Sequence, residues 1–143
     1  KGYHNMLWMN GKNPELIEEI GTMNIFFVIG NQVFTPRLNG NILEGLTRDS
    51  IITILKDKGI QVIEKDFSIN EVLSAYEKGN LKEAFGAGTA ANIAYIAKIG
   101  YKGKDMILPS MDFRPIGKML SETLDGIKTS RLPDPYGWVY PII

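Results

Sequence analysis

The stretch EAFGAGTAANIA, residues 83–94, combines glycines, alanines and a threonine within a chain that is otherwise rich in isoleucine, leucine and lysine. So little side-chain bulk allows a close approach to the main chain, either by a second backbone or by a bound molecule that is not protein. The residues LKEAFGAG, 81–88, are predicted to form a strand that runs into this stretch. Residues 90–99 are predicted to be strand-like or a short mixed segment.

Outward from this stretch, the sequence predicts strands and helices that alternate irregularly within one domain. The predicted strands are 5–11, 23–29 with a return over 32–35, 60–68, and a hairpin over 101–108. The predicted helices are 47–58, 69–78 with a capping box of Ser68 and Glu71, and 115–126. Residues 38–45 are predicted to be a loop, and the proline-rich tail from 131 onward is expected to be ordered only by packing.

The composition excludes several classes of protein. The 16 basic and 16 acidic side chains cancel, whereas a nucleic-acid-binding domain normally carries a basic excess. Cysteine is absent, which excludes disulfides and thiolate metal sites, and no spacing of histidine and carboxylates predicts a metal. The longest apolar run, 25–29, is far shorter than the roughly 20 residues that span a bilayer. The sequence starts without methionine, and we expect it to be part of a longer protein.

Two segments share a design that suits an anion. EGLTRDS, 44–50, and FGAGTAA, 85–91, each place glycine before a threonine. Free N–H groups at a helix start or in a tight glycine turn form a concave set of donors for phosphate. Neither segment is a P-loop, because no Gly-Lys-Ser/Thr follows. Two structural alternatives stay open: Thr47 as a helix cap, and Gly86 and Gly88 as markers of a bulge or of close packing.

A third segment, IEEIGTMNIFF at 17–27, places carboxylates at the mouth of an apolar strand. Glu18 and Glu19 can both be solvated, as most glutamates are. The alternative is that one of them points into a site and pairs with a cationic ligand atom.

The segments IEEIGTMNIF, TPRLNGNILEGLTRDSII and EAFGAGTAA, in this order and spacing, resemble branched-chain amino acid aminotransferases. These are class IV aminotransferases, pyridoxal-phosphate enzymes of fold type IV. The resemblance runs from NMLWMNG to PYGWVYP and implies that residues 1–143 are the C-terminal cofactor-binding domain. It implies an α+β fold, a mixed β pseudo-barrel with flanking helices, as in the second domain of the D-amino-acid aminotransferase-like fold.

The resemblance also implies cofactor-binding roles. Glu19, rather than Glu18, matches the glutamate that contacts the pyridine nitrogen of pyridoxal 5′-phosphate. Leu46 and Thr47 match the positions whose backbone N–H groups, and often a hydroxyl, hold the cofactor phosphate. Thr89 matches the threonine of the G-x-G-T-A motif, which holds the same phosphate.

For the substrate, the resemblance implies that backbone N–H groups at Thr89 and Ala90 bind the carboxylate. Thr22, beside Glu19, is expected to line the pocket. Arg37 stands where the family commonly has a second proline, and we expect it on the surface.

The lysine that forms the Schiff base in this family lies upstream of the strand that contains Leu7 and Trp8. We therefore expect no catalytic residue in this chain and expect the fragment alone to be inactive. The lysines considered for that role lie in polar stretches and are expected to be solvated: Lys1, Lys12, Lys56, Lys58 and Lys104.

The implied reaction is transfer of the amino group between leucine, isoleucine or valine and 2-oxoglutarate, as in branched-chain amino acid biosynthesis. The implied protein is a cytoplasmic homodimer whose partners are small-molecule amino acids and 2-oxo acids, with no nucleic acid, membrane or metal. D-amino-acid aminotransferase and aminodeoxychorismate lyase share the scaffold and remain alternatives. A non-catalytic cofactor-binding domain without the lysine is a third.

Overall fold

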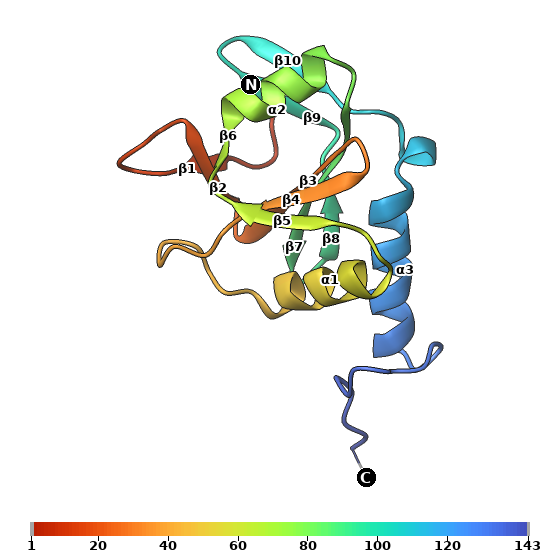
Figure 1. The fold of residues 1–143 in the computed structure, drawn as a ribbon. Helices are drawn as coiled ribbons and strands as arrows, with labels where there is room; N and C mark the ends of the chain where they lie inside the picture. Colours follow the sequence, from red (N-terminus) through yellow and green to blue (C-terminus); the bar gives the residue numbers. More distant parts are fainter. Residues whose placement is uncertain (1, 143) are drawn as a thin grey trace.

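The computed structural model describes residues 2–142 and has a sheet-rich body with three α-helices, which confirms the predicted α+β class (Figure 1). The helices are α1 Leu46–Asp57, α2 Ile69–Glu77 and α3 Pro115–Lys128, with a short 3₁₀ turn, η1 Met111–Phe113. The strands are β1 Leu7–Met9, β2 Leu16–Ile20, β3 Met23–Ile29, β4 Gln32–Pro36, β5 Val62–Lys65, β6 Phe67–Ser68, β7 Leu81–Gly88, β8 Asn92–Tyr95, β9 Lys98–Tyr101 and β10 Lys104–Ile107.

The pairing of the strands closes on itself. Strand β3 pairs with β2 near its start and with β4 near its end, along the same edge. Strand β4 pairs in parallel with β5, which runs into β6, and β6 returns to pair with β2. This ring is the predicted pseudo-barrel. The opposite edge of β3 carries β7, which continues the sheet to β8.

Strand β3 is buried on both faces, so it divides two hydrophobic cores. Ile25 and Phe27 face a core completed by α2 and by the β9–β10 hairpin. Phe26 and Val28 face a second core, to which α1 and α3 contribute. Side chains alternate between the two faces of a strand, so the continuous apolar run IFFVI, residues 25–29, fills both cores.

Helices α2 and α3 begin where the sequence supplies a start signal. Ser68 caps α2 and accepts the N–H of Glu71, while the Glu71 side chain accepts the N–H of Ser68, as the capping box predicts. Pro115 occupies the first turn of α3, where a missing N–H costs little. Helix α1 has no side-chain cap, and this bears on the site.

Several boundaries differ from the sequence-based predictions. The predicted strand over 60–68 is interrupted at Asp66, which pairs with Arg37. At this residue the chain passes from β5, which pairs with β4, to β6, which pairs with β2. Arg37 is on the surface, as expected, with 61% of its side chain exposed. The last hairpin spans 98–107 rather than 101–108. Strand β2, Leu16–Ile20, is absent from the predicted strands.

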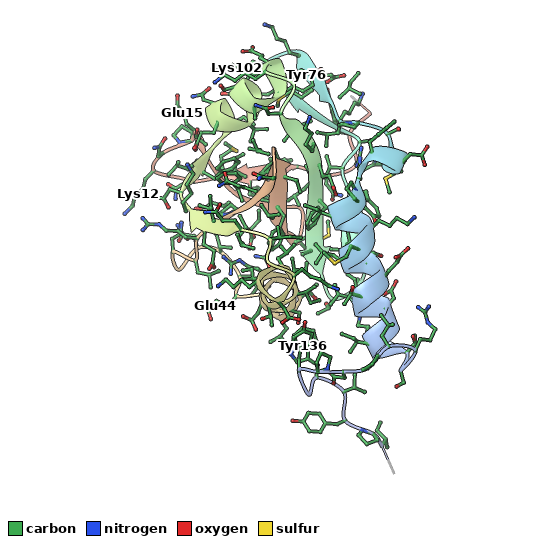
Figure 2. All side chains as sticks on the ribbon, turned by 45° about the vertical axis from the view of Figure 1, so that its right-hand side comes forward. Lys12, Glu15, Glu44, Tyr76, Lys102 and Tyr136 are labelled. Carbon is green, nitrogen blue, oxygen red and sulfur yellow. The ribbon has the colours of Figure 1, made fainter. Side chains whose placement is uncertain are left out.

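The tail after α3 is held by aromatic packing and also by hydrogen bonds, so the expectation that packing alone orders it is wrong. Tyr136 and Trp138 stack with ring centroids 4.2 Å apart and pack against the core beside α1. The hydroxyl of Tyr136 donates to Asp57, the last residue of α1, at 2.9 Å. Figure 2 shows the Tyr136 side chain close to this helix. Among the helices of residues 2–142, none has the length and apolar character needed to cross a bilayer.

Candidate functional site

Glu19 lies on β2, next to the turn into β3, and its carboxylate is directed at a loop. It is half-buried and lies opposite Asn24 of β3 in the antiparallel ladder. Its Oε1 accepts the backbone N–H of Leu43 at 2.8 Å. Glu18 instead accepts the side-chain amide of Asn10 at 2.8 Å. Glu18 also accepts the side-chain amide of Asn41, in the loop that leads into α1, at 3.4 Å. Glu19 differs because it accepts a backbone N–H of that loop, so the two glutamates are not equivalent.

Asn24 of β3 also holds this loop, a role that the sequence analysis did not predict. It is buried, and its Nδ2 donates to the carbonyl of Leu43 at 2.9 Å. A Cβ added to Gly45 would overlap Asn24 Oδ1, so any other residue at that position requires the Asn24 side chain to move. The sequence signal was an amide inside an apolar strand, since a buried amide requires specific partners.

The loop ends at the N-terminus of α1, which is open. The helix begins at Leu46, and the residue before it, Gly45, provides no side-chain cap. Thr47 is the second residue of the helix, so the alternative of Thr47 as the cap is wrong. The first N–H groups of a helix have no partner within the helix. They carry the positive end of its dipole and suit an anion.

Thr89 and Ala90 lie in the turn between β7 and β8, and both are exposed. Gly88 and Asn92 face each other in the ladder and close this turn. Gly86 and Gly88 of β7 pack against Met23, because a Cβ added to either glycine would lie 3.0 Å from the Met23 side chain. The close-packing alternative is therefore correct for both glycines. It leaves open what contacts the turn itself.

Register brings these pieces to one end of the sheet. The β3–β7 ladder is antiparallel and pairs Asn24 with Ala87, so the turn before β3, which contains Thr22, and the turn after β7, which contains Thr89, lie at the same end of the two strands. Leu46, Thr47 and Thr89 line one pocket of about 480 Å³, which Asn92, Lys128 and Trp138 also line. Glu19, Thr22 and Ala90 do not line this pocket. Glu19 joins it through the 43–45 loop.

A buried acid lies near the start of β7, at the end of the strand away from the Thr89 turn. Glu83 is 1% exposed and accepts the N–H groups of Ile116 and Gly117 at 2.8 and 2.7 Å, at the start of α3. Burial raises the pKa of Glu83 above its ordinary value, and the two backbone hydrogen bonds and the nearby Arg114 oppose that rise only in part. This contact joins residues more than 30 positions apart, so no local pattern predicts it.

The comparison with known protein families decides the classification. The profile of the family described as Amino-transferase class IV matches residues 1–99. The chain belongs to the class IV aminotransferases.

Individual relatives of this class IV aminotransferase chain match nearly its whole length. A probable branched-chain-amino-acid aminotransferase of Staphylococcus epidermidis is 43% identical over 137 residues, 96% of this chain and 38% of that protein. The branched-chain amino acid aminotransferase from Escherichia coli has a TM-score of 0.77 at 30% identity, over 96% of this chain and 42% of that one. An aminotransferase from Brucella abortus bound to the cofactor PLP has a TM-score of 0.68 at 27% identity, over 86% and 40%.

The chain thus spans about two fifths of the length of these relatives. Within the class IV aminotransferase chain, the lysines considered above are exposed at positions 12, 56, 58 and 104. Lys1 lies outside the described residues. The expectation that these lysines are solvated is confirmed for the four that the structure describes.

Proposed function

We propose that residues 1–143 are the C-terminal, cofactor-binding domain of a pyridoxal-phosphate-dependent branched-chain amino acid aminotransferase. One observation carries the proposal. The Glu19 carboxylate is hydrogen-bonded to the loop that ends at the uncapped N-terminus of α1, so an acid and an anion-binding helix start belong to one connected unit. The names of the relatives support the branched-chain group.

The donors of the chain fit the phosphate end of the cofactor. No side chain occupies the cap position of α1, so the N–H groups of Leu46 and Thr47 are open to a phosphate. Thr47 and Thr89 line the same pocket and can add hydroxyl donors. Asn24 and Gly45 hold the loop so that these donors keep their direction.

Glu19 fits the ring end. A carboxylate beside the pyridine nitrogen keeps that nitrogen protonated, because the opposite charge favours the charged form of the ring. When bound, pyridoxal phosphate supplies an electron-withdrawing ring that makes the Cα proton of an amino acid acidic. Glu19 is already oriented for this role by the N–H of Leu43.

The substrate contacts follow from the turns at the same end of the sheet. Thr89 and Ala90 present backbone N–H groups in an exposed turn, where they can receive the substrate carboxylate. Thr22, exposed in the turn before β3, is proposed to line the pocket beside them. The Schiff-base lysine, which also moves the Cα proton, is proposed to come from a part of the protein outside this chain.

The proposed substrates are leucine, isoleucine and valine, with 2-oxoglutarate as the amino acceptor, in a cytoplasmic homodimer. The test supplies the complete protein with pyridoxal phosphate and 2-oxoglutarate and measures glutamate formed from each branched-chain amino acid. Glutamate formation from L-leucine is the expected result. Reaction with D-alanine alone, or pyruvate release from aminodeoxychorismate, would replace the proposal with one of its two alternatives.

A pair of neighbouring variants tests the site. Glu19→Gln removes the charge while leaving an acceptor for Leu43, so turnover should fall by about 100-fold or more while pyridoxal phosphate still binds. Glu18→Gln is the matched control, because Glu18 bonds only to asparagine side chains, and its turnover should stay within about twofold of wild type. Equal turnover in both variants would remove Glu19 from the proposed role.

A further inference from the structure

Asn92 closes the turn that carries Thr89 and Ala90, and its backbone is unusual. Its φ is 54°, in the left-handed region that few residues other than glycine adopt, although asparagine tolerates it better than most. Asn92 faces Gly88 in the ladder, so the three residues between them form the turn. It is only 7% exposed, although it is a polar residue at the end of a hairpin.

The Asn92 side chain is held by two groups of α3, a helix that is far away in the sequence. Its Nδ2 donates to Asp125 Oδ1 at 2.7 Å. Its Oδ1 accepts from Lys128 Nζ at 2.8 Å. Each polar end of the amide therefore has a charged partner, and hydrogen bonds to charged groups are the stronger kind.

The start of α3 is tied to the same hairpin. Glu83 of β7 accepts the N–H groups of Ile116 and Gly117, while the last turn of α3 holds Asn92 at the start of β8. Helix α3 therefore braces the β7–β8 hairpin at two places, on either side of Thr89 and Ala90. Asn92 and Lys128 also line the pocket that contains Thr47 and Thr89.

We propose that Asn92 is a positioning residue for the phosphate of the cofactor. By tying the turn to Asp125 and Lys128, it keeps the Thr89 hydroxyl directed at the open N-terminus of α1. This inference rests on the proposed function, because it concerns the same phosphate. It goes further in one respect: the affinity for the phosphate also depends on α3, a helix to which the proposed function assigns no contact with cofactor or substrate.

A purely conformational role is the competing explanation. In that case Asn92 is present only because it tolerates a positive φ, and glycine would serve as well or better. Asn92→Gly keeps that backbone freedom but removes both bonds to α3. It therefore separates the two explanations.

The test compares two ligands that differ only in the phosphate. Equilibrium dialysis of the complete protein with pyridoxal 5′-phosphate and with pyridoxal gives a ratio of affinities that isolates the phosphate contribution. General destabilisation of the fold lowers both affinities together and leaves the ratio unchanged. We expect Asn92→Gly to lower the ratio about tenfold, the loss that follows when charged hydrogen bonds no longer hold the turn.

Exchanging the amide of Asn92 and the carboxylate of Asp125 between the two positions tests whether the affinity ratio can be restored. Asn92→Asp sets a carboxylate against Asp125, so the ratio should again fall by about tenfold. The double variant Asn92→Asp with Asp125→Asn restores an amide–carboxylate pair and leaves Lys128 its acceptor, and its ratio should return to within about twofold of wild type. Asp125→Asn alone still offers an acceptor to Asn92 and is the mild control.

A fall in the ratio in both single variants at Asn92, with recovery in the double variant, supports the inference. An unchanged ratio in Asn92→Gly, or no recovery in the double variant, overturns it and leaves the proposed function intact. A wild-type protein that binds pyridoxal as tightly as pyridoxal 5′-phosphate would overturn the proposed function, and this inference with it.

Discussion

Glu83 is a buried acid whose environment acts in two opposing directions. Two backbone N–H groups and Arg114 favour its carboxylate form, while burial favours its protonated form more strongly and raises the pKa. The folded protein therefore holds this proton more tightly than the unfolded chain does. Its contribution to stability is fully present below the unfolded pKa and is lost as the pH rises through the folded pKa.

Glu83→Gln tests this sign, because glutamine does not titrate. The free energy of unfolding of wild type, relative to the variant, should fall as the pH rises from about 4.5, the ordinary glutamate pKa, through the raised value, and then level off. Urea unfolding of both proteins across a pH series measures the difference, and all other titrating groups are shared. A difference that increases with pH over this interval would mean that the hydrogen bonds outweigh burial.

The start of helix α2 is held by two reciprocal hydrogen bonds, and the Ser68 side chain makes one of them. Ser68→Ala removes the acceptor for the N–H of Glu71 and should lower the free energy of unfolding by about 1 kcal/mol. Ser74→Ala, at an exposed position inside the same helix, is the control and should cost nothing, since alanine favours helix. Chemical denaturation measures both. Equal losses would contradict the capping role.

The loop before α1 depends on the absence of a side chain at Gly45. The backbone there, φ −67° and ψ 134°, suits any residue, so the cost of Gly45→Ala comes only from the overlap with Asn24. Asn24 would have to give up its bond to Leu43, and we expect a loss of about 1–3 kcal/mol in the free energy of unfolding.

Gly11→Ala is the matched control for Gly45→Ala, because no atom outside its chain neighbours lies within 4 Å of the added Cβ. Its free energy of unfolding should stay within about 0.5 kcal/mol of wild type. If thermal or chemical denaturation shows the two variants to be equally stable, Asn24 does not constrain the loop.

Features that rest on local spacing were predictable from the sequence. The capping box of α2 and the buried strand β3 each depend on residues within a few positions of one another. The last hairpin was misplaced because Gly100 interrupts its apolar pattern. Tyr3, far away in the sequence, packs on Gly100 and leaves no room for a side chain. Local reasoning has no access to such a cause.

The candidate site divides in the same way. The motifs around Glu19, Thr47 and Thr89 could be found from the sequence because each is a contiguous segment and the three occur in the order and spacing of the family. Their supports could not, since Asn24 reaches a loop 19 residues away and Asn92 is bonded to Lys128, 36 residues away. These contacts exist only once the sheet has closed and α3 has docked.

The central claim is that Glu19 pairs with the ring nitrogen of pyridoxal phosphate while α1 and the Thr89 turn hold its phosphate. The most direct measurement is the nitrogen-15 chemical shift of ring-labelled pyridoxal phosphate bound to the complete protein. The account predicts a protonated ring nitrogen in wild type and an unprotonated one in Glu19→Gln. The same shift in both proteins would contradict it.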